Sequence, residues 1–151
     1  MIRKAKIQDI KQIQALINSF AKEDLMLPRS LNELYETLRD FWVAADGERI
    51  IGCCALHISW DDLAEIKSFV VAKKAQGKGV GRELVLTCLS EAKELGVKRM
   101  FALTYKPDYF KKFGFKKVKN SALPHKIWAE CINCCKFPNC QEVALIKNLP
   151  N

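Results

Sequence analysis

A strand, a glycine-rich loop and a helix that follow one another directly constrain this chain more than any other part of its sequence. In the stretch LAEIKSFVV, residues 63–71, apolar and polar residues alternate at first, and the last three residues are all apolar, as in a strand that becomes buried. The loop KKAQGKGVGR comes next. Residues 84–95 then place apolar side chains at helical spacing, and Gly96 is a typical helix end. The fold must therefore place this loop between the end of a strand and the start of a helix.

Further strands and helices are predicted on both sides of this unit. We expect strands at residues 2–7, 97–104, 115–118 and 142–149, and a hairpin over 41–60 that turns at Asp46-Gly47. We expect one helix at residues 8–23 and a second that begins after the capping-box match of Ser30 with Glu33. A third helix is expected over 107–114, where a proline stands at the start. This order predicts an α/β (α+β) fold in which helices interrupt one mixed sheet.

Length and charge limit the class of protein. A chain of 151 residues is long enough for one domain with one core, and the net charge of +8 favours an anionic partner such as nucleic acid, anionic lipid or a phosphate-bearing cofactor. No apolar run approaches the roughly 20 residues that span a bilayer, and the N-terminus has no signal-peptide pattern. We therefore expect a cytoplasmic protein whose seven cysteines are mostly reduced.

The glycine loop favours an anion. A helix N-terminus carries unpaired N–H groups and partial positive charge, and glycines let a ligand approach those amides closely. Nearby basic side chains add full charges: Lys73, Lys74, Lys78 and Arg82. The loop matches neither the P-loop nor the dinucleotide fingerprint G-x-G-x-x-G, because Arg82 stands at the sixth position of the latter. Glycine spacing alone leaves a flexible, solvated loop as the other interpretation.

Two landmarks resemble the GNAT superfamily of acyl-coenzyme A-dependent N-acetyltransferases. EIKSFVVAKKAQGKGVGRELV is similar to its Q/R-x-x-G-x-G/A motif, and YFKKFGF at 109–115 is similar to its aromatic-x-x-x-G-F segment. The resemblance covers essentially the whole chain. It implies the GNAT fold, with a mixed, mostly antiparallel central sheet of about six to seven strands flanked by about four helices. It also implies acetyl-CoA as the cofactor, with no metal needed for catalysis.

The resemblance implies where coenzyme A binds. The backbone of the strand before the loop splays from its neighbour and bonds the pantetheine arm, which implies Phe69, Val70 and Val71. The loop holds the pyrophosphate, which implies Gln76, Gly77, Lys78, Gly79, Val80, Gly81 and Arg82.

Narrower similarities connect the chain with the acetyltransferase domain of N-acetylglutamate synthases, especially short stand-alone forms. The matching stretches are LPRSLNELYETLRDFWVA (27–44), AEIKSFVV (64–71), FALTYKPDYFKKFGF (101–115) and LPHKIWAECINCCKFPNC (123–140). The similarity implies one N-acetyltransferase domain over residues 1–151. It also implies acetylation of the α-amino group of an amino acid, with L-glutamate and arginine biosynthesis as the leading expectation.

Acetyl transfer to an amine requires a general base, because the ammonium group is protonated at pH 7. The resemblance implies Glu65 for this role, and a solvent-facing strand carboxylate is the other interpretation. Many members place a tyrosine four residues before the glycine of the G-F pair, where this chain has Phe110. Tyr105 is therefore the candidate general acid, unless it only packs and the thiol leaves without one.

A carboxylate on the acceptor requires a cationic partner. Arg29 matches an arginine that binds the substrate carboxylate in the family, with the backbone of Leu27 and Ser68 beside it, and Lys67 either lines the cleft or faces solvent. The carboxylate-binding arginine and serine near the C-terminus of the longer enzymes do not align with this chain. Other acceptors therefore stay open: another amino acid, a polyamine, a protein N-terminus or a drug.

A cysteine-rich segment over residues 123–140 is expected as an insertion before the last strand. Its spacing H-x5-C-x2-C-x5-C could supply a structural zinc site from His125, Cys131, Cys134 and Cys140. The other interpretation is a reduced loop in which cysteines act as small hydrophobes and no metal binds.

The alternative from a different class is a basic nucleic-acid-binding or regulatory module. Residues 67–82 and 111–119 carry the required positive charge, and aromatic residues lie near the second stretch, but their spacing fits a core better. We therefore expect a small-molecule amino acid as the partner and neither nucleic acid nor membrane. A homodimer stays open.

Overall fold

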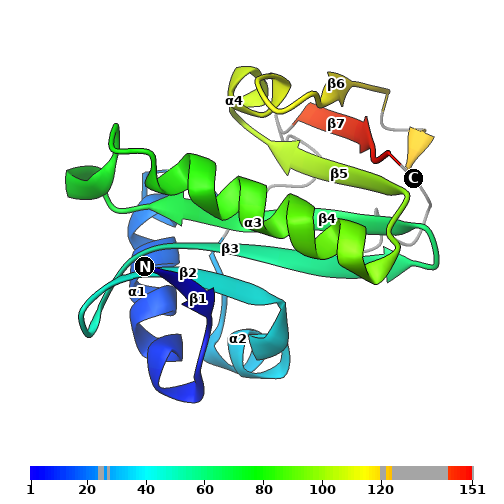
Figure 1. Ribbon diagram of the computed structural model, residues 1–151. Helices are drawn as coiled ribbons and strands as arrows, with labels where there is room; N and C mark the ends of the chain where they lie inside the picture. Colours follow the sequence, from blue (N-terminus) through cyan, green and yellow to red (C-terminus); the bar gives the residue numbers. More distant parts are fainter. Residues whose placement is uncertain (24–25, 27, 120–121, 124–142, 151) are drawn as a thin grey trace.

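The fold is described from a computed structural model that covers residues 1–23, 26, 28–119, 122–123 and 143–150. One sheet has the order β1-β2-β3-β4-β5-β7-β6 (Figure 1). Neighbouring strands are antiparallel except β4 and β5, which are parallel. The strands are β1 (Ile2–Lys4), β2 (Phe41–Asp46), β3 (Arg49–Trp60), β4 (Leu63–Val71), β5 (Arg99–Thr104), β6 (Lys116–Lys117) and β7 (Val143–Asn148).

Helices cover both faces of the sheet (Figure 1). One face packs against α1 (Ile10–Ala21) and α2 (Leu31–Glu36), and the other against α3 (Val80–Leu95) and α4 (Pro107–Lys111). Short 3-10 turns are η1 (Ile7–Asp9), η2 (Leu38–Asp40) and η3 (Lys73–Ala75). Within the described ranges, every helix lacks the length or the apolar surface that a membrane span needs. The predicted order of elements and the fold class are confirmed.

The N-terminal boundaries differ from the prediction for a local reason. The first strand ends at Lys4 instead of residue 7, and α1 begins at Ile10 after the η1 turn. The backbone N–H of Lys6 donates to Asp9 Oδ2 at 2.8 Å, which turns the chain before the helix begins. The N-cap half of the capping-box prediction is confirmed, because Ser30 Oγ accepts from the backbone N–H of Glu33 at 3.2 Å. The Glu33 carboxylate accepts from the Ser30 hydroxyl at 3.3 Å rather than from its backbone N–H.

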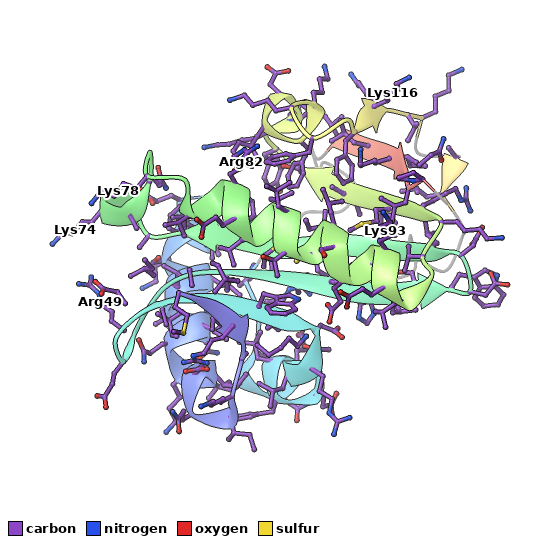
Figure 2. All side chains as sticks on the ribbon, in the orientation of Figure 1. Arg49, Lys74, Lys78, Arg82, Lys93 and Lys116 are labelled. Carbon is purple, nitrogen blue, oxygen red and sulfur yellow. The ribbon has the colours of Figure 1, made fainter. Side chains whose placement is uncertain are left out.

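The labelled basic side chains in Figure 2 are all exposed and come from several elements. They are Arg49 on β3, Lys74 and Lys78 at the glycine loop, Arg82 and Lys93 on α3, and Lys116 on β6. The net positive charge is therefore spread over several faces, with part of it gathered at the loop.

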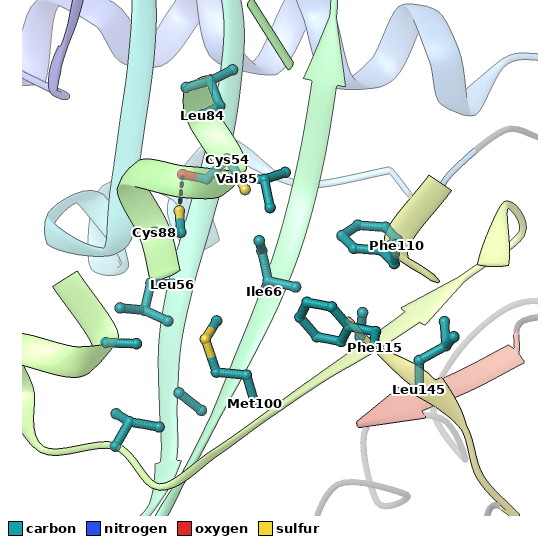
Figure 3. Close-up of a cluster of buried hydrophobic side chains, with 14 of the residues drawn as sticks. Cys54, Leu56, Ile66, Leu84, Val85, Cys88, Met100, Phe110, Phe115 and Leu145 are labelled. Atoms are coloured by element: carbon teal, nitrogen blue, oxygen red, sulfur yellow. Dashed lines mark hydrogen bonds between the residues drawn. The ribbon is translucent and has the colours of Figure 1, made fainter. Parts of the chain in front are cut away.

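The core beneath α3 joins the helix to the centre of the sheet (Figure 3). Leu84, Val85 and Cys88 of α3 pack with Leu56 of β3 and Ile66 of β4, and all five are buried. Burying the apolar surface of such residues contributes about 25 cal/mol per Å². The helix that follows the glycine loop is thereby fixed to the strand that precedes the loop.

Buried cysteines form part of this packing. Cys53, Cys54 and Cys88 are free thiols, and burial raises the pKa of Cys53 and Cys54 well above the usual range. Buried, inaccessible thiols are unreactive. These three cysteines therefore act as small hydrophobes.

The sheet opens between β4 and β5. The two strands share register pairs only from Leu63 to Glu65, opposite residues 99–101, although β4 continues to Val71. β4 also contains a bulge: between the pairs Cys53–Val70 and Ala55–Lys67, β3 advances two residues and β4 three. Ser68 in the bulge has a φ of 51°, the only positive value among the described residues other than glycines. The β5-facing edge of residues 66–71 is consequently open, and this opening leads to the glycine loop.

Asp9 stabilises the N-terminal segment, where it joins β1 to the turn before α1. Its side chain is nearly buried and accepts two hydrogen bonds from Arg3, at 2.7 and 3.1 Å. These bonds are the main cause that lowers the pKa of Asp9 below its ordinary 3.8. We predict that Asp9→Asn lowers the free energy of unfolding by about 1–3 kcal/mol at pH 7.

The pH dependence of this effect has a definite sign. A lowered pKa stabilises the folded state above the unfolded value, and the gain is lost as the pH falls through the folded value. The difference between wild type and Asp9→Asn in urea unfolding should therefore shrink below pH 3.8. Asp61→Asn, at an exposed turn, is the control and should show no such loss. An Asp9→Asn deficit that stays constant down to pH 3 would contradict this account.

Candidate active site

A cleft of about 1450 Å³ occupies the opening between β4 and β5. Its walls come from α2 and the segment before it, from β3 and β4, from the glycine loop and α3, from the end of β5 and from α4. Pockets for single drug-sized ligands measure about 300–1,000 Å³. The cleft is therefore large enough for more than one small ligand.

The glycine loop forms one end of the cleft. Gly77 and Gly79 have φ values of 78° and 86°, which favour glycine, and Gly79 is the N-cap of α3 without a side-chain cap. No side chain caps the N–H groups in the first turn of α3, so these groups can donate hydrogen bonds to an anion. The side chain of Gln76 donates from Nε2 to the carbonyl of Val71 at 3.0 Å, which ties the loop to the open strand edge.

Gly81 allows two aromatic rings to approach α3. A Cβ at this position would lie 2.8 Å from the hydroxyl oxygen of Tyr109 and 3.0 Å from Cζ of Phe69. The two rings stack with centroids 5.3 Å apart, and burial raises the pKa of Tyr109. A neutral aromatic wall therefore runs from the start of α3 to the bulge of β4.

Positive charge surrounds the loop (Figure 2). Lys73 forms an ion pair with Glu23 at 2.8 Å. For Lys74, Lys78 and Arg82, no carboxylate of the described residues lies within 4 Å. These three cations are available to an anionic ligand.

The other end of the cleft brings four ionisable side chains together. Glu65 of β4 is only 9% exposed, and its Oε1 lies 3.8 Å from Nζ of Lys67. The strand partner of Glu65 is His57 of β3, whose Nδ1 lies 2.7 Å from Oδ2 of Asp40. This bond is the main cause that raises the pKa of His57. A buried carboxylate and a half-exposed imidazole thus line the same part of the cleft.

Arg29 lines the cleft from the chain segment before α2. Its backbone is fixed to α1, because its N–H donates to Oδ1 of Asn18 at 3.1 Å and its carbonyl accepts from the side chain of Gln14 at 3.2 Å. Its guanidinium donates to Oε2 of Glu33 at 3.3 Å, and the Glu33 side chain is 55% exposed. Such an exposed pair is weak and leaves the guanidinium available to another carboxylate.

Most of the predicted site residues line this one cleft. Those that do are Arg29, Glu65, Lys67, Ser68, Phe69, Val70, Val71, Gln76, Gly77, Gly79, Gly81, Arg82 and Tyr105. Lys78 and Val80 lie in the loop and at the start of α3 but do not line it, and Leu27 lies outside the described residues. The alternative of a solvent-facing position for Glu65 and Lys67 is therefore wrong.

Sequence reasoning missed several lining residues. Tyr109, Asp40 and His57 line the cleft, although the sequence motifs assign them no role. A signal for His57 existed, because the hairpin that turns at residues 61–62 places it opposite Glu65. No such signal existed for Asp40, which belongs to a different segment.

Two further expectations bear on other functions. His125, Cys131, Cys134 and Cys140 lie outside the described residues; within the described ranges, no group of three or more potential ligands is arranged for a metal. The aromatic side chains near the basic stretch 111–119 pack on one another, as their spacing predicts, in the contacts of Tyr109, Phe110, Phe113 and Phe115.

Comparison with known proteins agrees with this geometry. Residues 7–115 match the family model described as acetyltransferase (GNAT) family. An uncharacterized N-acetyltransferase of Chlorobaculum tepidum is 38% identical over 148 residues, 98% of this chain and 96% of that protein. An amino-acid acetyltransferase of Mycobacterium tuberculosis is 31% identical over 133 residues, 86% of this chain and 76% of that protein.

A solved structure extends the comparison. The N-acetylglutamate synthase of Neisseria gonorrhoeae, complexed with coenzyme A and N-acetyl-glutamate, superposes with a TM-score of 0.91 at 26% identity. The match covers 100% of this chain and 35% of that protein, so this chain corresponds to about a third of the longer enzyme. Sequence, fold and cleft agree, and the chain belongs to the GNAT family as an acetyl-CoA-dependent N-acetyltransferase.

Proposed function

We propose that this enzyme acetylates the α-amino group of an amino acid, with L-glutamate as the leading acceptor and the first acetylation of arginine biosynthesis as its role. The observation that carries the proposal is the arrangement of Glu65, Lys67 and Arg29 in the same cleft as the glycine loop. A base and two cations at one end suit an amine that also bears carboxylates. The amino-acid acetyltransferases among its relatives support the same acceptor class.

The donor occupies the loop end in this proposal. The amides of residues 76–82 bind the pyrophosphate of acetyl-CoA, and Arg82 with the nearby lysines supplies the long-range attraction. The pantetheine arm extends along the open edge of β4 at Phe69, Val70 and Val71, whose β5-facing side has no strand partner among the described residues. The thioester then lies near the bulge at Ser68, where the two ends of the cleft meet.

The reaction is a direct attack of the amine on the thioester. Glu65 accepts the proton from the acceptor ammonium, directly or through a water, and the neutral nitrogen attacks the acetyl carbonyl carbon. The C–S bond breaks, the coenzyme leaves as a thiolate, and the nitrogen loses its second proton as it becomes an amide. Tyr105 follows β5 and lines the cleft, and we propose that it donates a proton to the thiolate and regains one from the amide nitrogen.

Gly81→Ala should weaken coenzyme A binding roughly tenfold, because the added methyl displaces the rings of Tyr109 and Phe69 from the cleft wall. Isothermal titration of coenzyme A measures the effect. Gly96→Ala is the matched control at the other end of α3. Gly96 has a φ of 84°, so the substitution should destabilise the fold, but the variant should bind coenzyme A normally. If Gly81→Ala and wild type bind coenzyme A with equal affinity, the proposal that the loop is part of the binding site is contradicted.

Glu65→Gln should lower kcat by about 10²–10⁴-fold and leave coenzyme A binding unchanged, because the amide cannot accept the proton. Thiol release from acetyl-CoA is followed with a panel of amino acids, and polyamines belong in the panel because the carboxylates of Glu33, Glu36 and Asp40 also line the cleft. Glu94→Gln, on the exposed surface of α3, is the control. Turnover with an amine that carries no carboxylate, and with no amino acid, would overturn the proposed acceptor.

Arg29→Lys should raise KM for the amino acid roughly tenfold while KM for acetyl-CoA stays the same, because an ammonium cannot bind a carboxylate through two parallel hydrogen bonds. Arg39→Lys, an exposed arginine outside the cleft, is the control. An unchanged KM for the acceptor would separate Arg29 from substrate recognition.

A further inference from the structure

We infer that the Asp40–His57 pair receives the proton that Glu65 removes from the acceptor amine and passes it to solvent. The inference rests on the proposed function, since that proposal makes Glu65 the base. His57 is a positioning and relay residue here: it acts through Glu65 and does not need to contact the acceptor.

The first support is the position of His57 relative to Glu65. The two residues are direct partners in the β3–β4 ladder, so both side chains lie on the same face of the sheet. Directly opposed residues have Cβ atoms about 4.5–5.5 Å apart. Their side-chain ends are therefore within reach of each other or of one bridging water, and both line the cleft.

The second support is the way the imidazole is held. Nδ1 lies 2.7 Å from Oδ2 of Asp40, so in the neutral ring this nitrogen carries the proton and donates it to the carboxylate. Nε2 is then the acceptor. Among the described residues, no hydrogen bond to Nε2 is present, and the His57 side chain is 37% exposed. One nitrogen is thus fixed while the other is accessible to a proton from the cleft and to solvent.

The third support is the charge around His57 from each neighbouring element. Asp40 of η2 and Glu65 of β4 raise the pKa of the imidazole, while its burial and Lys67 of β4 lower it. Glu33 and Glu36 of α2 line the same cleft. The carboxylates stabilise the imidazolium at the moment when it holds the transferred proton.

The proton balance of the relay is simple. One proton moves from the acceptor nitrogen to a carboxylate oxygen of Glu65, then to Nε2 of His57, and then to water; the proton on Nδ1 stays with Asp40. An imidazole is ordinarily a stronger base than a carboxylate, and the hydrogen bond to Asp40 raises the pKa of His57 further, so the second transfer runs toward the imidazole. Glu65 returns to its basic form after each turnover, although its burial separates it from bulk water.

A purely structural role explains these observations less well. Both members of the pair are partly exposed, at 37% and 26% of their side chains, and exposed ion pairs contribute little to stability. Packing also gives no reason for the pair to lie opposite a buried carboxylate in the cleft.

The test is kcat against pH for wild type, His57→Ala, His57→Gln and Asp40→Asn, at saturating acetyl-CoA and the best acceptor of the panel. We expect kcat of both His57 variants to fall roughly tenfold or more at pH 7, with unchanged coenzyme A affinity and melting temperature. Added imidazole should restore much of the activity of His57→Ala. The kcat of wild type should rise as His57 loses its proton, and Asp40→Asn should move this rise to lower pH because it removes the main cause of the raised pKa. Asp46→Asn, at an exposed turn, should leave the profile unchanged.

The outcomes separate the relay from the proposed function. An inactive Glu65→Gln with a fully active His57→Ala, or a slow His57→Ala that imidazole does not restore, would overturn the relay and leave the proposed base intact. A fully active Glu65→Gln would overturn both. If His57→Ala does not fold, the profile of His57→Gln decides alone.

Discussion

The divergence of β4 from β5 is the constraint on which the rest of the site depends. The two parallel strands pair through Leu63, Ala64 and Glu65 and then separate, although both continue. A buried strand edge without a partner would leave polar backbone groups unsatisfied, at a cost of about 1–3 kcal/mol each. The sheet tolerates this edge because it borders a cleft, where water or a ligand with its own donors and acceptors can bond it.

Two local departures from regular structure shape the cleft. The bulge at Ser68 adds one residue to β4 and changes which side chains face the opening, and the glycines at 77 and 79 turn the chain from the strand into α3. The core beneath α3 holds both ends of this turn in place, because side chains of the helix pack on the same strands. The positive φ of Ser68 and the open edge of β4 thus lie at the place where a substrate would bind.

The charges divide along the cleft. Around the loop, several cations lack a carboxylate partner among the described residues, which suits the phosphates of coenzyme A. At the other end, three basic side chains lie next to carboxylates: Arg29 with Glu33, Lys67 with Glu65, and His57 with Asp40. Paired charges of both signs suit a zwitterionic acceptor. The carboxylates and the imidazole can also take up the proton that leaves the reacting nitrogen.

The features that could be predicted from the sequence are those that depend on residues close to one another along the chain. Periodicity, the N-cap at Ser30 and the glycines located nearly all strands and helices, and the landmark motifs located the cleft. The early end of the first strand was missed because it depends on a hydrogen bond between Lys6 and the side chain of Asp9. The Asp40–His57 contact joins residues 17 positions apart across two elements, so no local pattern reports it.

Backbone amide hydrogen exchange, measured with and without coenzyme A, tests the central claim most directly. If the opening between β4 and β5 binds the coenzyme, amides of residues 69–71 and 76–82 should become protected, while those at the far end of α3 should not change. Protection absent from both stretches, or confined to residues 111–119, would contradict the account.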